Sequence, residues 1–283
     1  MKTKKILTVV FVLIFLVGLS LLLYPSVSDY WNSFHQSRAL AEYSSQVEEL
    51  DKEAYDQMWA KAEAYNQTLL SDPDRFTMTE EEQAEYDDLL NVSDIGIMGS
   101  IEIPAIDCSL PIYHGTQESV LQVAVGYLEG SSLPTGGKGT HCVLTGHRGL
   151  PRARLFTDLD KLKKGDLFVL KVLDRTMTYE VDQILTVDPY DMSALEIDPE
   201  QDYCTLATCT PYGINTHRLL VRGHRVENQE TSSDPQKTEE ERDRKPIVTI
   251  GITALLLLAV LLLGAGFVIR RKRRKKFPRQ KHR

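Results

Sequence analysis

The stretch Cys204-Thr-Leu-Ala-Thr-Cys209-Thr-Pro-Tyr-Gly-Ile-Asn-Thr-His-Arg218-Leu-Leu-Val-Arg-Gly223 decides the fold of this chain. Before Cys209 the residues alternate in polarity as a strand does, and the Pro-Tyr-Gly after it favours a loop. From Arg218 an extended run resumes. The pattern therefore predicts two strands joined by a loop, with Cys209 at the end of the first strand facing Arg218 at the start of the second.

These two side chains suit nucleophilic catalysis by a thiol. A guanidinium close to a thiol favours the thiolate, which is the nucleophilic form. The same guanidinium can bind the oxyanion that forms when a carbonyl is attacked. The flanking Thr208 and Thr210 are expected to support the site with hydrogen bonds. Arg222, further along the same strand face, is the alternative candidate for the arginine role.

A third group comes from an earlier β-type run. His147 stands between Gly146 and Gly149 on an open turn that follows Cys142-Val-Leu144. An imidazole beside a thiolate is the recurring arrangement for acyl transfer through a thioester. We therefore take His147, with Cys209 and Arg218, as the candidate catalytic set. The other histidines of this region are expected to be structural or at the surface, with His217 on the face opposite to Arg218: His114, His141, His217 and His224.

Short β-type runs separated by turn residues continue from Gly96 to the end of this region. Examples are residues 99–104, 110–115, 141–146 and 166–173. Runs this short and evenly spaced predict a sheet that is closed into a barrel or stacked as a sandwich.

The motifs in this region resemble those of a known family. Thr205-Leu-Ala-Thr-Cys209-Thr-Pro, with Arg218 nine residues after the cysteine, is similar to the signature of the sortases. The resemblance extends through Thr145-Gly-His147 and Ile101-Glu-Ile-Pro104 and covers roughly residues 95–225.

Two further segments resemble the pilus-assembling class of sortases, called class C. They are Tyr212-Gly-Ile-Asn-Thr-His-Arg-Leu-Leu-Val-Arg-Gly223 and Leu110-Pro-Ile-Tyr-His-Gly-Thr116. The apolar stretch near the C-terminus is a further feature of that class.

The resemblance implies a closed β-barrel of roughly eight strands with short helices. It implies that Cys209 attacks the Thr–Gly bond of an LPxTG-like sorting signal, that Arg218 stabilises the oxyanion and that His147 transfers protons. In class C the acyl group typically passes to a lysine amine of another pilin. The family implies a Gram-positive cell envelope and no redox cofactor. No cofactor or metal is expected, since no carboxylate cluster indicates calcium.

Pilus sortases often carry a lid with an Asp-Pro-aromatic motif over the active site. Asp72-Pro73-Asp-Arg-Phe76 lies in the expected region, although its aromatic residue stands three positions after the proline. We expect Asp72 to approach Arg218 or Cys209 and Phe76 to fill part of the groove. An ordinary Asp-Pro turn between two helices is the alternative.

The region before the β part is helical in pattern. Apolar residues recur at steps of three and four from Ala39 to Ala62. Asp72-Pro73 ends this pattern, and Thr79-Glu-Glu-Glu82 resembles a cap that opens a second short helix.

Both ends of the chain carry apolar stretches that suit a bilayer. Residues 6–24 and 247–269 are each close to the length of about 20 apolar residues that a spanning helix needs. Basic residues lie between each apolar stretch and the nearer end of the chain. Because basic flanks stay on the cytoplasmic side, both termini are expected in the cytoplasm. The first stretch could instead be a cleaved signal peptide, although Tyr24-Pro-Ser-Val-Ser28 offers no A-x-A cleavage pattern.

The expected organisation follows from these boundaries. In chain order it is a cytoplasmic N-terminus (1–5), a transmembrane signal anchor (6–24), a helical extension with the candidate lid (25–94), the catalytic β-barrel (95–226), a polar linker (227–246), a transmembrane helix (247–269) and a basic cytoplasmic tail (270–283).

The charge is divided between the ends and the middle. Of 33 lysines and arginines, 13 lie in the two tails, which leaves 20 against 40 acidic residues between them. An acidic external domain repels nucleic acid, so we expect no nucleic-acid partner.

Four cysteines raise the question of disulfides. An even count in an external domain invites two bridges, but the sequence alone does not assign a pairing among Cys108, Cys142, Cys204 and Cys209. Buried thiols are the alternative, and Cys204 as a resolving partner of Cys209 under oxidation is a third.

The predicted function is that of a membrane-anchored, peptidase-like cysteine transpeptidase that joins pilins. Three alternatives stay open. The enzyme could attach surface proteins to peptidoglycan, since the catalytic residues do not encode the acceptor. It could be a protease that uses water. The domain could also be a non-catalytic receptor or scaffold whose basic tail binds anionic lipid.

Overall fold

The computed structural model describes residues 2–92, 96–150 and 153–228. Within these residues, eight strands close into a barrel in the order β1-β2-β3-β4-β7-β8-β6-β5. The strands are β1 (Ile97–Ile103), β2 (Cys108–Tyr113), β3 (Val125–Tyr127), β4 (Thr140–Thr145), β5 (Leu167–Val172), β6 (Arg175–Val187), β7 (Asp202–Thr210) and β8 (His217–Val226). The predicted barrel is confirmed, and the sandwich is excluded.

The strands that carry the candidate catalytic residues have one face in the core and one face outside it. On β7, Cys204 and Leu206 belong to the main buried cluster of the barrel. Ala207 belongs to a second cluster on the other face, which we call the outer cluster; it is formed by Val143, Leu195, Ala207 and Leu220. Because successive side chains of a strand point to opposite faces, Cys209 shares the outer face with Ala207.

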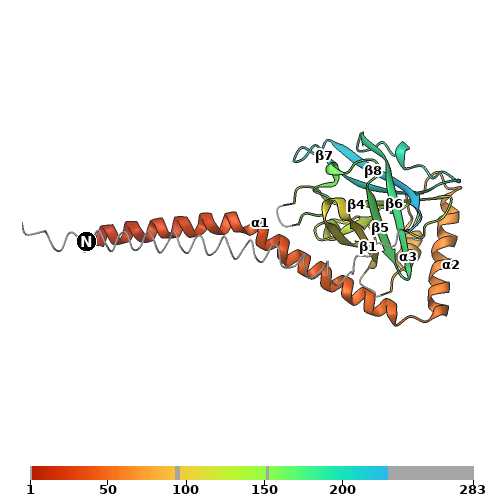
Figure 1. Cartoon of the computed structure of the whole chain (residues 1–283), viewed down its shortest axis with the longest axis horizontal. Helices are drawn as coiled ribbons and strands as arrows, with labels where there is room; N and C mark the ends of the chain where they lie inside the picture. The colour runs from red at the N-terminus through yellow and green to blue at the C-terminus, as the bar shows by residue number, and fades with distance from the viewer. Residues whose placement is uncertain (1, 93–95, 151–152, 229–283) are drawn as a thin grey trace, which may run out of the picture. The chain divides into compact units, whose positions relative to one another are not determined.

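Helix α2 (Lys52–Leu69) of the extension packs on the barrel, as Figure 1 shows. Trp59 Nε1 donates a hydrogen bond to the carboxylate of Asp174 in the β5–β6 turn at 2.8 Å. The buried Asn66 side chain donates to the carbonyl of Leu133 at 3.1 Å and accepts from its amide at 2.7 Å. The extension is therefore attached to the barrel through polar contacts as well as apolar ones.

Capping residues set the starts of α2 and of the next helix, α3 (Glu80–Asp87). Asp51 accepts a hydrogen bond from the amide of Ala54 at the start of α2. The preceding helix, α1, ends at Glu48. The helical pattern expected from residue 39 to residue 62 is therefore divided between two helices. Thr79 and Glu82 form the expected capping box before α3. A cap of this kind is worth about 1 kcal/mol.

The first helix, α1 (Lys2–Glu48), contains the apolar stretch predicted as an anchor. The part of the helix from Val10 contains an 18-residue window with a mean hydropathy of 2.5, and it is long and apolar enough to cross a membrane by length and composition. The helix continues without a break past residue 24, the predicted end of the anchor, and contains Pro25. Further along, Tyr43 contacts the barrel, donating to the carbonyl of Met98 at 3.0 Å.

Short helices complete the fold: η1 (Pro104–Ile106), α4 (Glu118–Leu121), η2 (Leu159–Lys161) and η3 (Ser193–Leu195). The predicted linker beyond residue 228, the second membrane span over residues 247–269 and the basic tail over residues 270–283 lie outside the described residues.

Candidate active site

Cys209 and Arg218 are directly opposite each other in the antiparallel pair β7–β8. Both are half-buried. Leu220, two residues after Arg218, belongs to the outer cluster, so the Arg218 side chain faces outward as Cys209 does. Side chains in such positions have Cβ atoms about 5 Å apart. The predicted strand–loop–strand unit is confirmed. It brings a thiol and a guanidinium together at one end of the barrel.

His147 lies at the end of β4, which runs parallel to β7. The last pair of that ladder is Thr145 with Ala207, and Gly146 continues it, its amide donating to the carbonyl of Ala207 at 3.1 Å. Carried two residues beyond this pair, the register puts His147 level with Cys209. The three candidate catalytic residues therefore stand at the ends of three neighbouring strands.

Gly146 has a steric reason to be glycine. A Cβ atom there would lie 2.9 Å from Cδ2 of Phe156, whose ring is fully buried. The loop after His147 thus packs tightly on the turn that presents the imidazole.

The two threonines beside Cys209 have different surroundings. Thr208 is buried, and its hydroxyl donates to the carbonyl of Gly146 at 2.7 Å. Thr210 is half-buried and accepts from Nη1 of Arg148 at 3.4 Å. Both therefore connect the strand that carries the thiol to the turn that carries the histidine.

Arg148 was missed by the sequence analysis. Its side chain is 9% exposed, forms an ion pair with Asp160 and lies with its Cζ 5.7 Å from the centre of the Tyr212 ring. Through these contacts Arg148 holds the β7–β8 loop against the His147 turn. The carboxylate partner comes from η2, so no local pattern in the sequence indicates the pair.

Glu118 was missed as well. It begins α4, and its Oε2 lies 3.4 Å from Nε2 of His147. The two residues are 29 positions apart, in segments that come together because β3 pairs with β4.

Arg222 does not occupy the position of the oxyanion-binding group. It is opposite Thr205 in the ladder, and its guanidinium forms two hydrogen bonds with Asp182, at 3.1 and 2.8 Å. It also lies 4.0 Å from the centre of the Tyr203 ring. The ladder therefore favours Arg218 over Arg222 for the catalytic role. A cavity of about 580 Å³ is lined by Arg222, Tyr203 and residues of η3.

The candidate lid lies near the outer cluster. Phe76 is half-buried and packs against that cluster, which includes Ala207 on the same face as Cys209. Arg75 is buried and donates to the carbonyl of Leu195 at 3.0 Å. Asp72 is exposed, and its carboxylate accepts from the amide of Asp74 at 2.9 Å. The expected approach of Asp72 to Arg218 or Cys209 stays a prediction, as does the role of Pro73.

The other cysteines lie in the barrel. Cys142 and Cys204 are opposite each other on β4 and β7 and buried. Burial raises the pKa of the Cys204 thiol, and its hydrogen bond with Cys142 adds to the effect. Cys204 points into the core and Cys209 points out of it, which argues against Cys204 as a resolving partner. Cys108 is also buried, its sulfur 3.9 Å from the carbonyl of Leu155.

The remaining histidines range from buried to exposed. His141 is buried and bonds the carbonyl of Glu196 through Nδ1 at 2.8 Å and the hydroxyl of Thr205 through Nε2 at 2.7 Å. Burial lowers the pKa of His141 to about 4. His114 and His224 are half-buried, and His217 is exposed.

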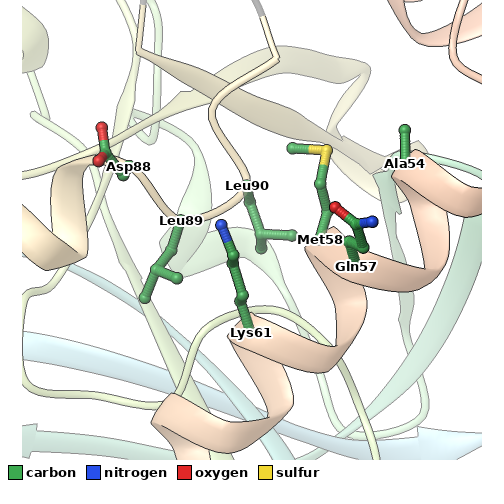
Figure 2. Close-up of a pocket in the computed structure, with 7 residues that line it drawn as sticks. All are labelled: Ala54, Gln57, Met58, Lys61, Asp88, Leu89 and Leu90. Carbon is green, nitrogen blue, oxygen red and sulfur yellow. The ribbon is translucent and has the colours of Figure 1, made fainter.

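Within the described residues, two further features of the protein lie apart from this site or are not found. Among the described residues, no group of three His, Cys, Asp or Glu side chains could hold a metal ion. A smaller cavity of about 140 Å³ lies between α2 and residues 88–90. Its lining residues, labelled in Figure 2, include none of the candidate catalytic residues.

Comparisons with known proteins agree with the barrel fold. Residues 101–226 match the family model described as Sortase domain. The crystal structure of sortase C1 from Streptococcus agalactiae is 51% identical with a TM-score of 0.66, and the match covers 68% of this chain and 100% of that chain. The structure of Streptococcus pneumoniae sortase C is 48% identical with a TM-score of 0.61, over 68% of this chain and 97% of that chain.

Among curated proteins, Sortase D of Bacillus subtilis is 33% identical over 131 residues. That match spans 45% of this chain and 63% of the relative, so less than two thirds of Sortase D is covered. With the solved structures matched over nearly their whole length, this chain belongs to the sortase family, whose members are cysteine transpeptidases, and it resembles the class C sortases.

Proposed function

We propose that this sortase is anchored in the membrane with its barrel outside the cell, cleaves an LPxTG-like sorting signal between Thr and Gly, and joins the Thr carbonyl to a lysine amine of a pilin. One observation carries the proposal. His147, Cys209 and Arg218 stand at the ends of the neighbouring strands β4, β7 and β8, with Cys209 and Arg218 in register.

In the first half-reaction, Sγ of Cys209 attacks the carbonyl carbon of the Thr residue. Arg218 lies opposite the thiol and stabilises the negative oxygen of the tetrahedral intermediate. The C–N bond then breaks, and His147 donates a proton to the departing glycine amine. The acyl group stays on Cys209 as a thioester.

In the second half-reaction, the lysine nitrogen attacks the thioester carbonyl. The C–S bond breaks, an isopeptide C–N bond forms, and the amine proton passes to His147, which is neutral after the first step. The thiolate of Cys209 and the protonated imidazole are thereby restored. No oxidant, cofactor or metal is needed for this balance.

The class of substrate is inferred from the class C resemblance. The structure of Streptococcus pneumoniae sortase C was described for its pilin substrate specificity, and its 48% identity supports a pilin as the substrate here. The apolar helix α1 supports a position at the membrane.

Transfer to lysine tests this function. We would incubate the full chain in detergent with an LPxTG-type peptide and a peptide that contains one lysine, and analyse the products by mass spectrometry. We expect an isopeptide-linked product and a released glycine-containing fragment, neither of which forms with Cys209→Ala. Exclusive hydrolysis of the first peptide would instead indicate a protease and overturn the transfer step.

A further inference from the structure

Glu118 lies within reach of the candidate acid–base residue. Its Oε2 is 3.4 Å from Nε2 of His147, and its other carboxylate oxygen accepts from the side-chain amide of Gln122. The contact with Gln122 spans one turn of α4 and restricts where the carboxylate can point. Glu118 thus presents a negative charge beside the imidazole.

The order of strands in the barrel places Glu118 on a definite side of His147. The neighbours of β4 are β3 on one side and β7 on the other. Glu118 belongs to α4, which packs on β3, whereas Cys209 is the residue before the end of β7. Along the rim of the barrel the groups therefore follow one another as carboxylate, imidazole, thiol and guanidinium: Glu118, His147, Cys209 and Arg218.

This order determines which reactant meets the carboxylate. The oxyanion forms beside Arg218, at one end of the row. The amine has to lie at His147, because that residue takes its proton, and the next group beyond His147 is Glu118. An acceptor lysine arrives as an ammonium ion, whose charge a carboxylate complements.

We propose that Glu118 binds the incoming ammonium group of the acceptor and so favours transfer to a lysine over attack by neutral nucleophiles. The inference rests on the proposed function and adds to it the recognition of the acceptor. Glu118 holds the ammonium at the rim until it gives one proton to solvent. The neutral nitrogen then attacks the thioester, the C–S bond breaks, and His147 takes the second proton from the nitrogen.

The exposure of the two side chains fits this role. The side chain of Glu118 is 69% exposed and that of His147 is 29% exposed. A carboxylate that is largely in solvent remains accessible to a second protein, and its substitution is not expected to unfold the barrel. Because exposed charges are screened, the effect should weaken with added salt.

The test is a competition for one thioacyl enzyme. The full chain in detergent is given an LPxTG-type peptide with two nucleophiles at once: a lysine derivative blocked at both its α-amine and its carboxyl group, which is cationic at neutral pH, and hydroxylamine, which is mostly neutral there. Mass spectrometry gives the ratio of lysine product to hydroxamate. Because both products come from the same intermediate, this ratio does not depend on the rate of the first half-reaction.

We expect Glu118→Gln to lower the ratio about fivefold, as the loss of one partly exposed charge pair would. Glu118→Lys should lower it further, and added salt should reduce the ratio of the wild type more than that of Glu118→Gln. The matched control is Glu129→Gln. Glu129 is a nearby carboxylate that accepts from Gln117 at 3.3 Å and from Gln83 at 3.3 Å, and its substitution should leave the ratio unchanged.

Two results would overturn the inference in different ways. If Glu118→Gln slows both products equally and the ratio stays at the wild-type value, Glu118 positions His147 and does not recognise the acceptor. If the wild-type protein forms no thioacyl intermediate, the proposed function itself fails, and the recognition of the acceptor fails with it.

Discussion

The hydroxyl of Thr208 donates a hydrogen bond to the carbonyl of Gly146 at 2.7 Å. Through this bond, the residue before Cys209 is connected to the residue before His147. The two proposed catalytic groups come from different strands, and the bond fixes the spacing of their backbones at the point where the β4–β7 ladder ends.

Replacing Thr208 with Val tests this connection. The change keeps the shape of the buried side chain but leaves the Gly146 carbonyl without this donor, which should cost about 1–3 kcal/mol of unfolding free energy. Transpeptidation should fall with it, because the His147 turn is no longer held. Thr208→Ser keeps the hydroxyl and is the control. Equal unfolding free energies for the Val and Ser variants, measured by denaturant titration, would contradict the role of the hydrogen bond.

Replacing Gly146 with Ala should displace the His147 turn. The new Cβ atom would lie 2.9 Å from the buried Phe156 ring, and overpacking of this kind costs about 1–3 kcal/mol. We expect a loss of both stability and activity.

A second substitution distinguishes the steric cause. Phe156→Leu removes ring atoms from the contact, so the double variant should be less destabilised than the sum of the two single changes. Additive unfolding free energies in this double-mutant cycle would show that the ring is not the obstacle.

His141 predicts a specific pH dependence of stability. Its folded-state pKa is lowered to about 4 by burial, against about 6.5 in an unfolded chain. Between these values the unfolded state binds the proton that the native state lacks, so stability falls as the pH drops from 6.5 to 4 and this contribution levels off below. The full loss is about 3 kcal/mol.

The measurement for His141 is the unfolding free energy at several pH values. In His141→Asn the side-chain amide can still donate to Glu196 but does not titrate, so the difference between wild type and variant should change over this window. A difference that is constant with pH would contradict the assignment.

We predict from the contacts of Phe76 and Arg75 that the lid segment limits access to Cys209. Phe76 packs on the outer cluster beside Ala207, and Arg75 bonds the carbonyl of Leu195. Phe76→Ala removes apolar burial worth about 1–2 kcal/mol, so labelling of Cys209 by a bulky thiol reagent should become roughly tenfold faster. Asp72→Ala, which removes a local turn contact, should have a smaller effect. Equal labelling rates in wild type and Phe76→Ala would favour an ordinary turn over a lid.

Substituting Arg218 and Arg222, the two outward-facing arginines of β8, should affect catalysis to different extents. Arg218→Lys loses the planar donor opposite Cys209 and should lower kcat/KM about 100-fold. Arg222→Lys alters the Asp182 pair and should change kcat/KM by less than about threefold, because Arg222 is opposite Thr205. Steady-state kinetics with an LPxTG-type peptide measures both. A larger loss for Arg222→Lys would reverse the assignment.

Local patterns were sufficient for the parts of the fold that local chemistry decides. The alternation before Cys209, the Pro-Tyr-Gly loop and the capping box at Thr79 each depend on a few consecutive residues, and the structure has all three. The facing of Cys209 and Arg218 followed from the same hairpin. Closure of the barrel followed from the spacing of the short runs and from the family resemblance, which selected it over a sandwich.

Contacts between distant segments were not predictable in the same way. Glu118 and His147 meet because β3 and β4 pair, and Arg148 meets Asp160 because η2 lies beside the turn that carries His147. Polar residues in such loops have the same sequence appearance whether they face solvent or a partner. The division of the expected helical pattern at Asp51 was likewise missed, since the apolar spacing continues on both sides of the cap.

The most direct test of the central claim is the mass of the protein after reaction with a sorting peptide. The full chain in detergent, as wild type and as Phe76→Ala, would be incubated with an LPxTG-type peptide, quenched in acid, and analysed by intact mass spectrometry and peptide mapping. We predict a thioacyl adduct, with loss of the glycine fragment, that maps to Cys209 and is absent from Cys209→Ala. An adduct on another cysteine, or no adduct in either protein, would contradict the claim that Cys209 is the nucleophile of a transpeptidase.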